Sequence, residues 1–548
     1  MELKLGGGAS PSEGRRCEMF SQHNGAIAVA AAVLMLRRRE QARKLRYSPR
    51  TRLLSIGKAA ELDLDQLGQP FRPSKSDTAL VPDDERLPDE GLWARTGVDY
   101  GPKRDVLNTG KSKLVVVFVG KPGCGKTYYA RKLTRFLCYA HFAARVFTYA
   151  TVRGEMYGRY QPPGFFSTQN AAGVEKREAV CRRALDDAMA YLEQGGEIAV
   201  LDGTNSRRTR RDMIRQRVEH SAQGQALGAH LLWVECICDD ATIMEAQLRN
   251  KVSGPEYSGF SSESEARADF QRRLDHYGAN YQTIADEEDG QSIQIFDCGR
   301  KSVLRNIHGW LQTRIVSFLN NVHTVPKRIF LTRHGESQYN TKGLIGGDPG
   351  LSEEGKKYAS VLAQWMQDLE QSSKGSSGDI SKLQIWSSTM NRALQTAGQT
   401  AEELVPKRRV VRWRCLQEID VGICDSLTYK QVQERWPEEF EARTKDKLRY
   451  RYPRGESYLD IIERLEPVIM ALESEREPVM VVAHQAVHRC LYAYFRNIPP
   501  HEVPFISIPL HEVIEIIPQA YGCTEKRHKL MAVNPKSEVS QKHCVARK

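Results

Sequence analysis

The segment that most constrains the fold of this chain is a glycine-rich sequence that directly follows a short apolar run. The letters GKPGCGKT at 120–127 match the phosphate-binding pattern G-x-x-x-x-G-K-[ST] in full, and the run 114–119 before them has the composition of a buried strand. A strand, a glycine loop and a helix in this order belong to a parallel α/β sheet. We expect the nucleotide phosphates to be bound by Gly120, Gly123, Gly125, Lys126 and Thr127.

A second acidic group completes this predicted site. Asp202 follows the apolar run 198–201, at the position where a carboxylate holds the water shell of a metal. We therefore predict that Thr127 and Asp202 bind Mg²⁺ and that Lys126 reaches the outer phosphates of ATP. An aspartate after a strand is also a common helix cap, and only its pairing with the loop favours the metal.

A dense group of arginines follows Asp202, at 207, 208, 210 and 211. Guanidinium groups bind phosphate oxygens well, so we expect one or two of these side chains to be functional and the others to be solvated. No positioned general base is evident here. Phosphoryl transfer depends mostly on positioning and on charge neutralisation, so none is required.

A different phosphate chemistry is indicated about 200 residues later. The letters LTRHGE at 331–336 place Arg333 and His334 on a glycine turn after an apolar strand. Arg392 follows the strand 383–386, and His484 closes the strand 479–482. A histidine nucleophile needs cations around the phosphoryl group, and these residues supply them.

The leaving alcohol of such a reaction needs a proton donor. Glu418, in LQEID at 416–420, is the candidate acid, and it would afterwards activate water against the phosphohistidine. Asp420 is the competing candidate for this role.

The length of 548 residues is too great for one core, and the two motifs divide the chain into two α/β halves. We expect an irregular N-terminal extension over 1–108, a first domain over 109–322, a second over 323–525, and a tail over 526–548. The segment 370–380, rich in serine and glycine, is expected to be a surface loop.

The net charge of +12 indicates anionic partners without choosing among them. Twelve scattered cysteines and the absence of a secretory signal favour reduced thiols in the cytoplasm. The apolar run 25–36 is too short to cross a bilayer, which needs about 20 residues. It is interpreted as a surface helix, with membrane or organelle targeting as the alternative, and no stable membrane insertion is expected.

The first half resembles the 6-phosphofructo-2-kinase family in its DGTN sequence at 202–205 and in the arginines that follow. The resemblance implies a P-loop kinase domain with a three-layer parallel sheet. It also implies a catalytic lysine at Lys251, and sugar-phosphate ligands at Arg177, Arg208, Arg273 and Tyr277. The segment 152–159 departs from the family's Gly-Glu-Tyr-Arg-Arg run, and Arg159 is the candidate replacement for the missing arginine.

The second half resembles the histidine phosphatases of phosphoglycerate mutase fold, and within them fructose-2,6-bisphosphatase, in long segments such as GGDPGLS at 346–352 and RYRYPRGESY at 449–458. The resemblance implies a second α/β domain with a separate anion site for the other phosphate of the substrate. The residues that match this site are Tyr429, Arg443, Lys447, Tyr458, Gln485 and Arg489, and the resemblance places Asn340 near the reacting group.

Together the resemblances imply a bifunctional enzyme that makes fructose 2,6-bisphosphate from fructose 6-phosphate and MgATP and hydrolyses it through a phosphohistidine. A homodimer is implied as well. The altered segment 152–159 motivates one rival, a phosphatase with a degenerate, regulatory kinase half. The basic charge motivates a second, a polynucleotide kinase-phosphatase, but aromatic residues make up only 8% of the chain and no nucleic-acid partner is expected.

Overall fold

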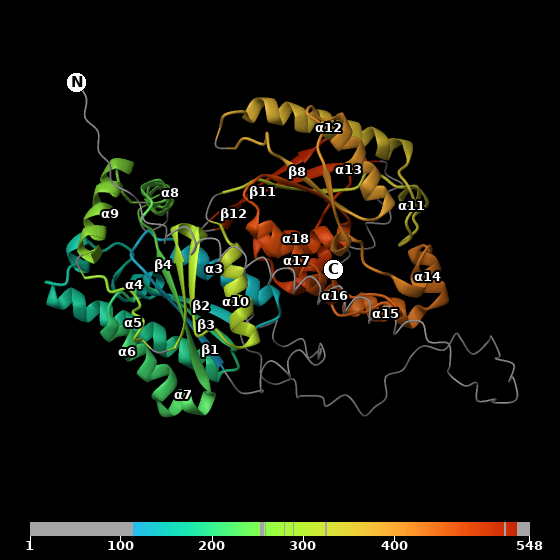
Figure 1. Ribbon diagram of the computed structural model, residues 1–548. Coiled ribbons are helices and arrows are strands. Elements are labelled where there is room, and N and C mark those ends of the chain that lie inside the picture. Colours follow the sequence, from blue (N-terminus) through green and yellow to red (C-terminus); the bar gives the residue numbers. More distant parts are fainter. Residues whose placement is uncertain are drawn as a thin grey trace, which may run out of the picture. The chain divides into compact units, whose positions relative to one another are not determined.

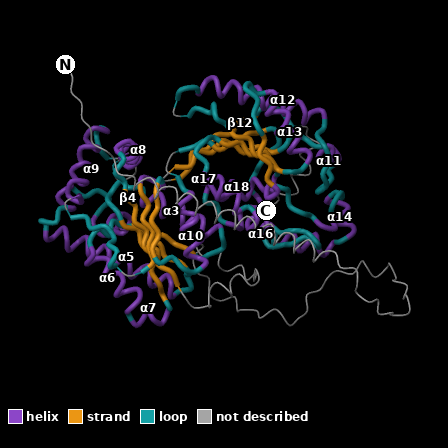
Figure 2. Tube along the Cα trace, viewed as in Figure 1, coloured by secondary structure: helices purple, strands orange, loops and turns teal. Residues whose placement is uncertain are grey.

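The computed structural model describes residues 113–533, apart from 253–256, 258, 279, 289, 324–325, 377 and 520–521. The predictions for the N-terminal extension, for its apolar run 25–36 and for the last part of the tail fall outside the described residues. Within the described part, two six-stranded sheets follow one another along the chain, and helices cover both faces of each sheet (Figures 1 and 2).

The first sheet has the strand order β2-β3-β1-β4-β5-β6, in which β6 alone runs antiparallel to its neighbour. Its strands are β1 (Lys113–Val119), β2 (Ala144–Thr148), β3 (Ile198–Asp202), β4 (Ala229–Ile237), β5 (Gln291–Phe296) and β6 (Lys301–Arg305). Its helices are α3 (Lys126–Tyr139), α4 (Tyr149–Tyr157), α5 (Ala171–Glu193), α6 (Arg208–Arg215), α7 (Ala222–Leu227), α8 (Ala241–Val252), α9 (Glu263–Gly278) and α10 (Trp310–Asn321).

The central strand β1 is apolar almost throughout because both of its faces are covered. Val116 and Phe118 pack towards α3 and α10, while Val115 and Val117 pack towards α5 and α6. This alternation follows from the two-residue period of a strand. It fixes β1 in the middle of the layers, so its carboxyl end delivers the glycine loop to the centre of one edge of the sheet.

The second sheet has the order β12-β11-β7-β10-β8-β9, with four parallel strands and an antiparallel pair at one side. Its strands are β7 (Ile329–Arg333), β8 (Gln384–Ser388), β9 (Val410–Trp413), β10 (Val479–Ala483), β11 (Glu512–Gln519) and β12 (Gly522–Lys529). Its helices are α11 (Gln338–Lys342), α12 (Glu353–Ser373), α13 (Asn391–Glu403), α14 (Tyr429–Arg435), α15 (Pro437–Lys445), α16 (Tyr458–Arg464), α17 (Glu466–Ser474) and α18 (Gln485–Arg496).

Helices α12 and α13 cover one face of this sheet, and α16, α17 and α18 cover the other (Figure 1). The apolar cluster under α16–α18 is continuous with the cluster under α3 and α10 of the first sheet. Two ion pairs cross the same boundary: Lys132 of α3 with Glu473 of α17, and Arg314 of α10 with Glu466 of α17. The two α/β units therefore share one core.

The predicted α/β architecture of both halves is confirmed. The predicted strands 114–119, 198–201, 231–237 and 479–482 lie within observed strands, and the predicted strand 383–386 overlaps β8, which begins at Gln384. Two details differ. Helix α12 continues to Ser373 and so occupies the start of the expected loop 370–380, and β12 extends past the expected domain end at residue 525 to Lys529. Among the described helices, none is long and apolar enough to cross a membrane.

Candidate active sites

The glycine loop between β1 and α3 has the backbone geometry of a phosphate cradle. Gly120, Gly123 and Gly125 all have positive φ, at 145°, 82° and 81°. A side chain at Gly120 would collide with the carbonyl of Cys236, so only glycine permits this close packing. The loop ends at the N-terminus of α3, where unpaired N–H groups and the helix dipole favour an anion.

Lys126 and Thr127 begin α3, and their side chains line a cavity together with Asp202. Strands β1 and β3 are neighbours, which brings the end of β3 beside the loop. Asp202 is buried and accepts a hydrogen bond from the Thr127 hydroxyl. Burial raises the pKa of Asp202, and the nearby Lys126 opposes that shift.

The remaining oxygen of Asp202 makes this pair suitable for a metal. Its Oδ2 atom is buried and has no hydrogen-bond partner among the described residues. A hydroxyl and a carboxylate beside a phosphate cradle are the protein ligands that Mg²⁺ takes in nucleotide sites, where phosphates and water complete its shell. The residues present therefore fit a magnesium ion.

Five helices contribute cationic and phenolic side chains to the same cavity. Arg153 comes from α4, Arg177 from α5, Arg210 from α6, and Arg273 and Tyr277 from α9. Lys251, at the end of α8, also lines the cavity. The cavity thus combines a phosphate cradle at one end with a cluster of guanidinium groups, as a site for two phosphorylated molecules requires.

Phe166 organises two of these guanidinium groups. The guanidinium carbon of Arg273 lies 3.9 Å from the centre of the Phe166 ring, and that of Arg153 lies 5.5 Å from it. Arg177 is held differently, because it donates to the backbone carbonyls of Phe165 and Ser167. Arg210 forms an ion pair with Glu178.

Two arginines that were predicted to serve this cavity do not line it. The side chain of Arg208 is exposed and does not line the cavity, whereas Arg210 does. Arg159 is also exposed and outside the cavity, and the arginine that the altered segment contributes is Arg153. Arg153 was not predicted as a cavity residue, and Arg210 was predicted only as one member of the arginine group at 207–211, because the sequence does not show which face of a short helix points into the cavity.

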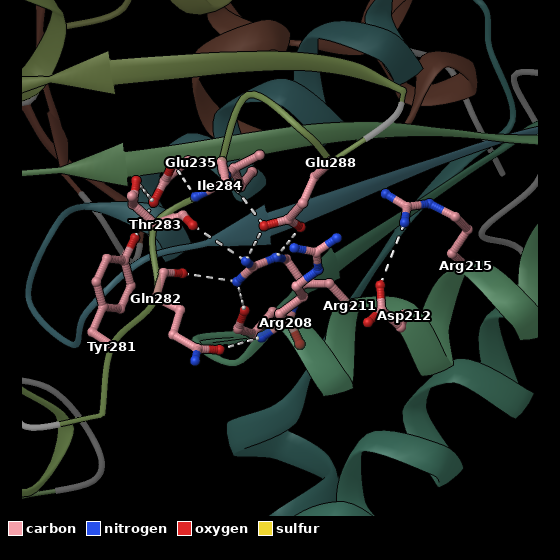
Figure 3. Close-up of polar contacts among 12 residues, drawn as sticks. Arg208, Arg211, Asp212, Arg215, Glu235, Tyr281, Gln282, Thr283, Ile284 and Glu288 are labelled. Carbon is pink, nitrogen blue, oxygen red and sulfur yellow. Dashed lines mark hydrogen bonds and ion pairs between the residues drawn. The ribbon is translucent and has the colours of Figure 1, made fainter.

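Arg211 has a structural role, although it belongs to the same arginine group. Its guanidinium is fully buried, pairs with Glu288, and donates to the carbonyls of Asn205, Gln282 and Thr283 (Figure 3). Arg211 therefore ties the DGTN turn to the segment that precedes β5.

In the second domain, three parallel strands bring reacting side chains to one edge of the sheet. Strands β7, β10 and β8 are neighbours in the sheet. His334 directly follows β7, His484 directly follows β10, and Arg392 is the second residue of α13, four residues after β8 ends. The backbone N–H of His334 donates to the Ala483 carbonyl at 3.0 Å. The rings of His334 and His484 lie with their centres 5.1 Å apart.

His334 has the state that a nucleophile requires. Burial and the charges of Arg392 and Arg333 lower its pKa well below the ordinary value, so the ring is neutral. Its Nδ1 lies 2.7 Å from the Gly335 carbonyl, which can only accept, so Nδ1 carries the hydrogen. The lone pair is then on Nε2, where Arg392 Nε donates to it at 3.1 Å. Arg333 donates to the Ile508 carbonyl.

Glu418 is placed by the start of α18. Its carboxylate accepts from the backbone N–H groups of Gln485 and Ala486, at 3.0 and 3.1 Å. Glu418 lines the cavity that contains His334 and Arg392, whereas Asp420 is exposed and does not line it. The geometry thus favours Glu418 over Asp420 as the proton donor.

The residues expected to form a second anion site line the same cavity. Its walls include Asn340, Tyr429, Arg443, Lys447, Tyr458, Gln485 and Arg489. Phenols hold the guanidinium groups in place: Arg443 donates to Tyr452 at 2.7 Å and to Tyr429 at 3.1 Å, and Arg489 donates to Tyr458 at 2.8 Å. Tyr452 was not predicted, although it lies inside the quoted segment 449–458.

Comparisons with known proteins assign each domain separately. The family model for 6-phosphofructo-2-kinase matches residues 103–326, and that for the histidine phosphatase superfamily, branch 1, matches residues 329–530. The first-half match is thus to a sugar-phosphate kinase rather than to a polynucleotide kinase.

Curated relatives match across both domains. A 6-phosphofructo-2-kinase/fructose-2,6-bisphosphatase from Arabidopsis thaliana is 42% identical over 436 residues, which are 79% of this chain and 55% of that protein. The protein of that name from Gallus gallus is also 42% identical, over 75% of this chain and 83% of its own length. A Rattus norvegicus relative is 41% identical over 77% of this chain and 86% of its own. This chain therefore spans about half of the plant protein but most of the two animal proteins.

Proposed function

The chain belongs to the bifunctional 6-phosphofructo-2-kinase/fructose-2,6-bisphosphatase family, and we propose that its two cavities catalyse opposite reactions at one position of a sugar phosphate. The first cavity phosphorylates fructose 6-phosphate at its 2-hydroxyl with MgATP. The second hydrolyses fructose 2,6-bisphosphate at the 2-phosphate. The observation that carries the proposal is that one chain contains both a glycine cradle with a helix-borne arginine cluster and a buried pair of histidines with a separate anion site.

In the kinase cavity, the loop N–H groups and Lys126 bind the outer phosphates of ATP. Thr127 and Asp202 would hold Mg²⁺, which when bound neutralises charge on the transferring phosphoryl group. The guanidinium groups of Arg153, Arg210 and Arg273 bind the 6-phosphate of the sugar. Lys251, which acts electrostatically on Asp202, neutralises charge between the two substrates.

In the phosphatase cavity, Nε2 of His334 attacks the phosphorus of the 2-phosphate while Arg333 and Arg392 neutralise its oxygens. The bond from phosphorus to the sugar oxygen breaks, and Glu418 gives that oxygen a proton. Glu418 then takes a proton from water as the water attacks the phosphohistidine. The cluster around Arg443 and Arg489 binds the 6-phosphate, so the 2-phosphate is the one that reaches His334.

The rival function, a phosphatase with an inactive kinase half, was motivated by the altered segment 152–159. That segment supplies Arg153 to the kinase cavity, which removes the reason for the rival. We also propose a homodimer. β6 is an edge strand of the first sheet, and Leu304 on it is 50% exposed, so a second copy can pair along this edge.

We propose that the protein acts in the cytoplasm. None of the ten cysteines in the described part of the chain forms a disulfide, and several are buried as small apolar side chains.

The test measures both reactions in the purified full chain, alongside Lys126→Ala and His334→Ala. Lys126→Ala should abolish the kinase and spare the phosphatase, and His334→Ala should do the reverse. Mixing the wild-type protein with fructose 2,6-bisphosphate labelled at the 2-phosphate should transfer label to His334. Label on no histidine, or a kinase that survives Lys126→Ala, would contradict the proposal.

A further inference from the structure

Ser388 is a buried hydroxyl that touches the phosphatase site without lining its cavity. It is the last residue of β8, and its side chain is fully buried. Its Oγ lies 2.9 Å from Nε2 of His484 and 3.2 Å from the backbone nitrogen of Met390. The described residues give this hydroxyl no other side-chain partner.

The positions of the hydrogens on Ser388 and His484 follow from whether each hydrogen-bond partner can donate or accept. The Met390 N–H can only donate, so Ser388 Oγ accepts from it. The hydroxyl has one hydrogen of its own, and His484 Nε2 is the one acceptor that the described residues provide for it. If Nε2 carried the hydrogen instead, the buried Ser388 hydroxyl would have no acceptor, and Nδ1 would offer an anionic substrate a lone pair rather than a hydrogen; with the hydrogen on Nδ1, every donor is paired once substrate oxygens are present. Ser388 therefore donates, and Nε2 of His484 accepts.

The second nitrogen of His484 is then a donor. The ring is neutral because burial and the charge of Arg392 lower its pKa well below the ordinary value. With Nε2 as the acceptor, the ring hydrogen is on Nδ1. The Nδ1 atom is buried and has no hydrogen-bond partner among the described residues. A buried donor without an acceptor, in a ring 5.1 Å from that of His334, suits a ligand that brings anionic oxygens.

We infer that Ser388 is a positioning residue that fixes the tautomer of His484, so that Nδ1–H donates to an oxygen of the phosphoryl group that His334 accepts. The two histidines then have complementary roles: His334 offers a lone pair to phosphorus, and His484 offers a hydrogen to the phosphoryl oxygens. No proton leaves His484 in either step. The inference deepens the proposed phosphatase function and rests on it.

The chain supplies a matched control in Ser387. It is also fully buried, but neighbouring strand residues face opposite sides of a sheet, and the Ser387 hydroxyl donates to the Ser388 carbonyl. Ser388→Ala and Ser387→Ala therefore remove the same group from adjacent positions, and only the first touches His484. Ser388→Thr keeps a hydroxyl and serves as the conservative rescue.

Rapid-quench measurement of phosphohistidine formation should show about a tenfold lower rate in Ser388→Ala, the size expected when one orienting hydrogen bond is lost. KM should stay within about threefold, because the second anion site is intact. Ser387→Ala should stay within about twofold of wild type, and Ser388→Thr should recover most of the rate. Kinase activity of each variant reports whether the protein is folded.

A second measurement needs no variant of Ser388. In wild-type protein labelled with ¹⁵N in its histidine rings, two-bond correlation spectra should show Nδ1 of His484 bearing hydrogen, with His484→Gln identifying the signals. Hydrogen on Nε2, or equal rates in Ser388→Ala and Ser387→Ala, would overturn the inference. Failure of the proposed function is distinguishable, because wild-type protein would then form no phosphohistidine at all.

Discussion

The two cavities differ in the elements that supply their reacting groups. In the phosphatase cavity, His334 and His484 directly follow the parallel strands β7 and β10, and Arg392 lies in the first turn of α13, four residues after the adjacent strand β8. In the kinase cavity, the arginines that we propose to bind the sugar phosphate come from three different helices. A side chain at the end of a strand has a position that the sheet fixes, whereas successive side chains of a helix point in different directions around its axis. We therefore expect activity at a strand-end site to change when a single atom is removed. Activity at a helix-built site should instead depend on which face of the helix points into the cavity.

The largest expected effect tests the strand-end site. Glu418→Gln keeps the size of the side chain but cannot deliver a proton, so phosphatase kcat should fall about 10³-fold, within the usual range for general acid-base catalysis. Asp420→Asn is the control and should change kcat less than about threefold, because Asp420 is outside the cavity. Steady-state hydrolysis of fructose 2,6-bisphosphate measures both. A larger loss in the Asp420 variant would reverse the assignment.

The next largest effect tests whether the two domains unfold together. Glu473 is fully buried beside Lys132 and accepts a hydrogen bond from Tyr494 at 2.9 Å. Glu473→Gln leaves the Lys132 charge uncompensated and should lower the free energy of unfolding by about 3 kcal/mol. In thermal inactivation, both activities should be lost together at a lower temperature. Loss of one activity alone would show that the domains are independent.

The same residue predicts a pH dependence. Its neighbouring lysines hold the pKa of Glu473 at about 2, below its ordinary value of 4.5. The carboxylate therefore stabilises the fold above about pH 4.5, and this stabilisation is lost as the pH falls towards 2. The difference in urea midpoint between wild type and Glu473→Gln should accordingly shrink between pH 6 and pH 3.

The helix-built site should respond to changes of helix face. Arg153→Leu should raise the kinase KM for fructose 6-phosphate about 30-fold, because a charge-assisted contact to phosphate is lost. KM for ATP should change less than about twofold. Arg159→Leu removes an equal charge from the exposed end of the same segment and should leave both constants near wild type. Equal effects of the two variants would show that only net charge matters.

The smallest effect separates two arginines of one helix. Arg210→Ala should raise KM for fructose 6-phosphate by about fivefold, less than Arg153→Leu because Arg210 is already paired with Glu178. Arg208→Ala should change it by less than about twofold. Initial-rate kinetics with fructose 6-phosphate varied measures both. The reverse order would place Arg208, rather than Arg210, on the substrate.

These differences explain how far the sequence could predict the sites. The glycine loop, Asp202, His334, Arg392 and His484 follow strands, and an apolar run identifies a strand end directly. Arg208 and Arg210 are two residues apart on a helix, about 200° around its axis, so only one of them can face the cavity. Which one does is decided by tertiary packing, which a single sequence does not contain.

The hydrogen-bond roles of other residues were equally hidden from the sequence. Ser388 and Arg211 are common residue types inside recognisable motifs, and their importance lies in which atoms they reach. Strands β11 and β12 were missed because β11 mixes glutamates with apolar residues and β12 is almost entirely polar, as suits an antiparallel pair at the side of a sheet.

The apolar cluster that joins α3 and α10 to α16, α17 and α18 has a consequence for control of the metabolite. Two opposing catalysts fused through one interior are always synthesised in equal numbers, and neither can be removed without the other. This protein can therefore shift the level of the bisphosphate through the relative speeds of its two catalysts, but not through their relative amounts.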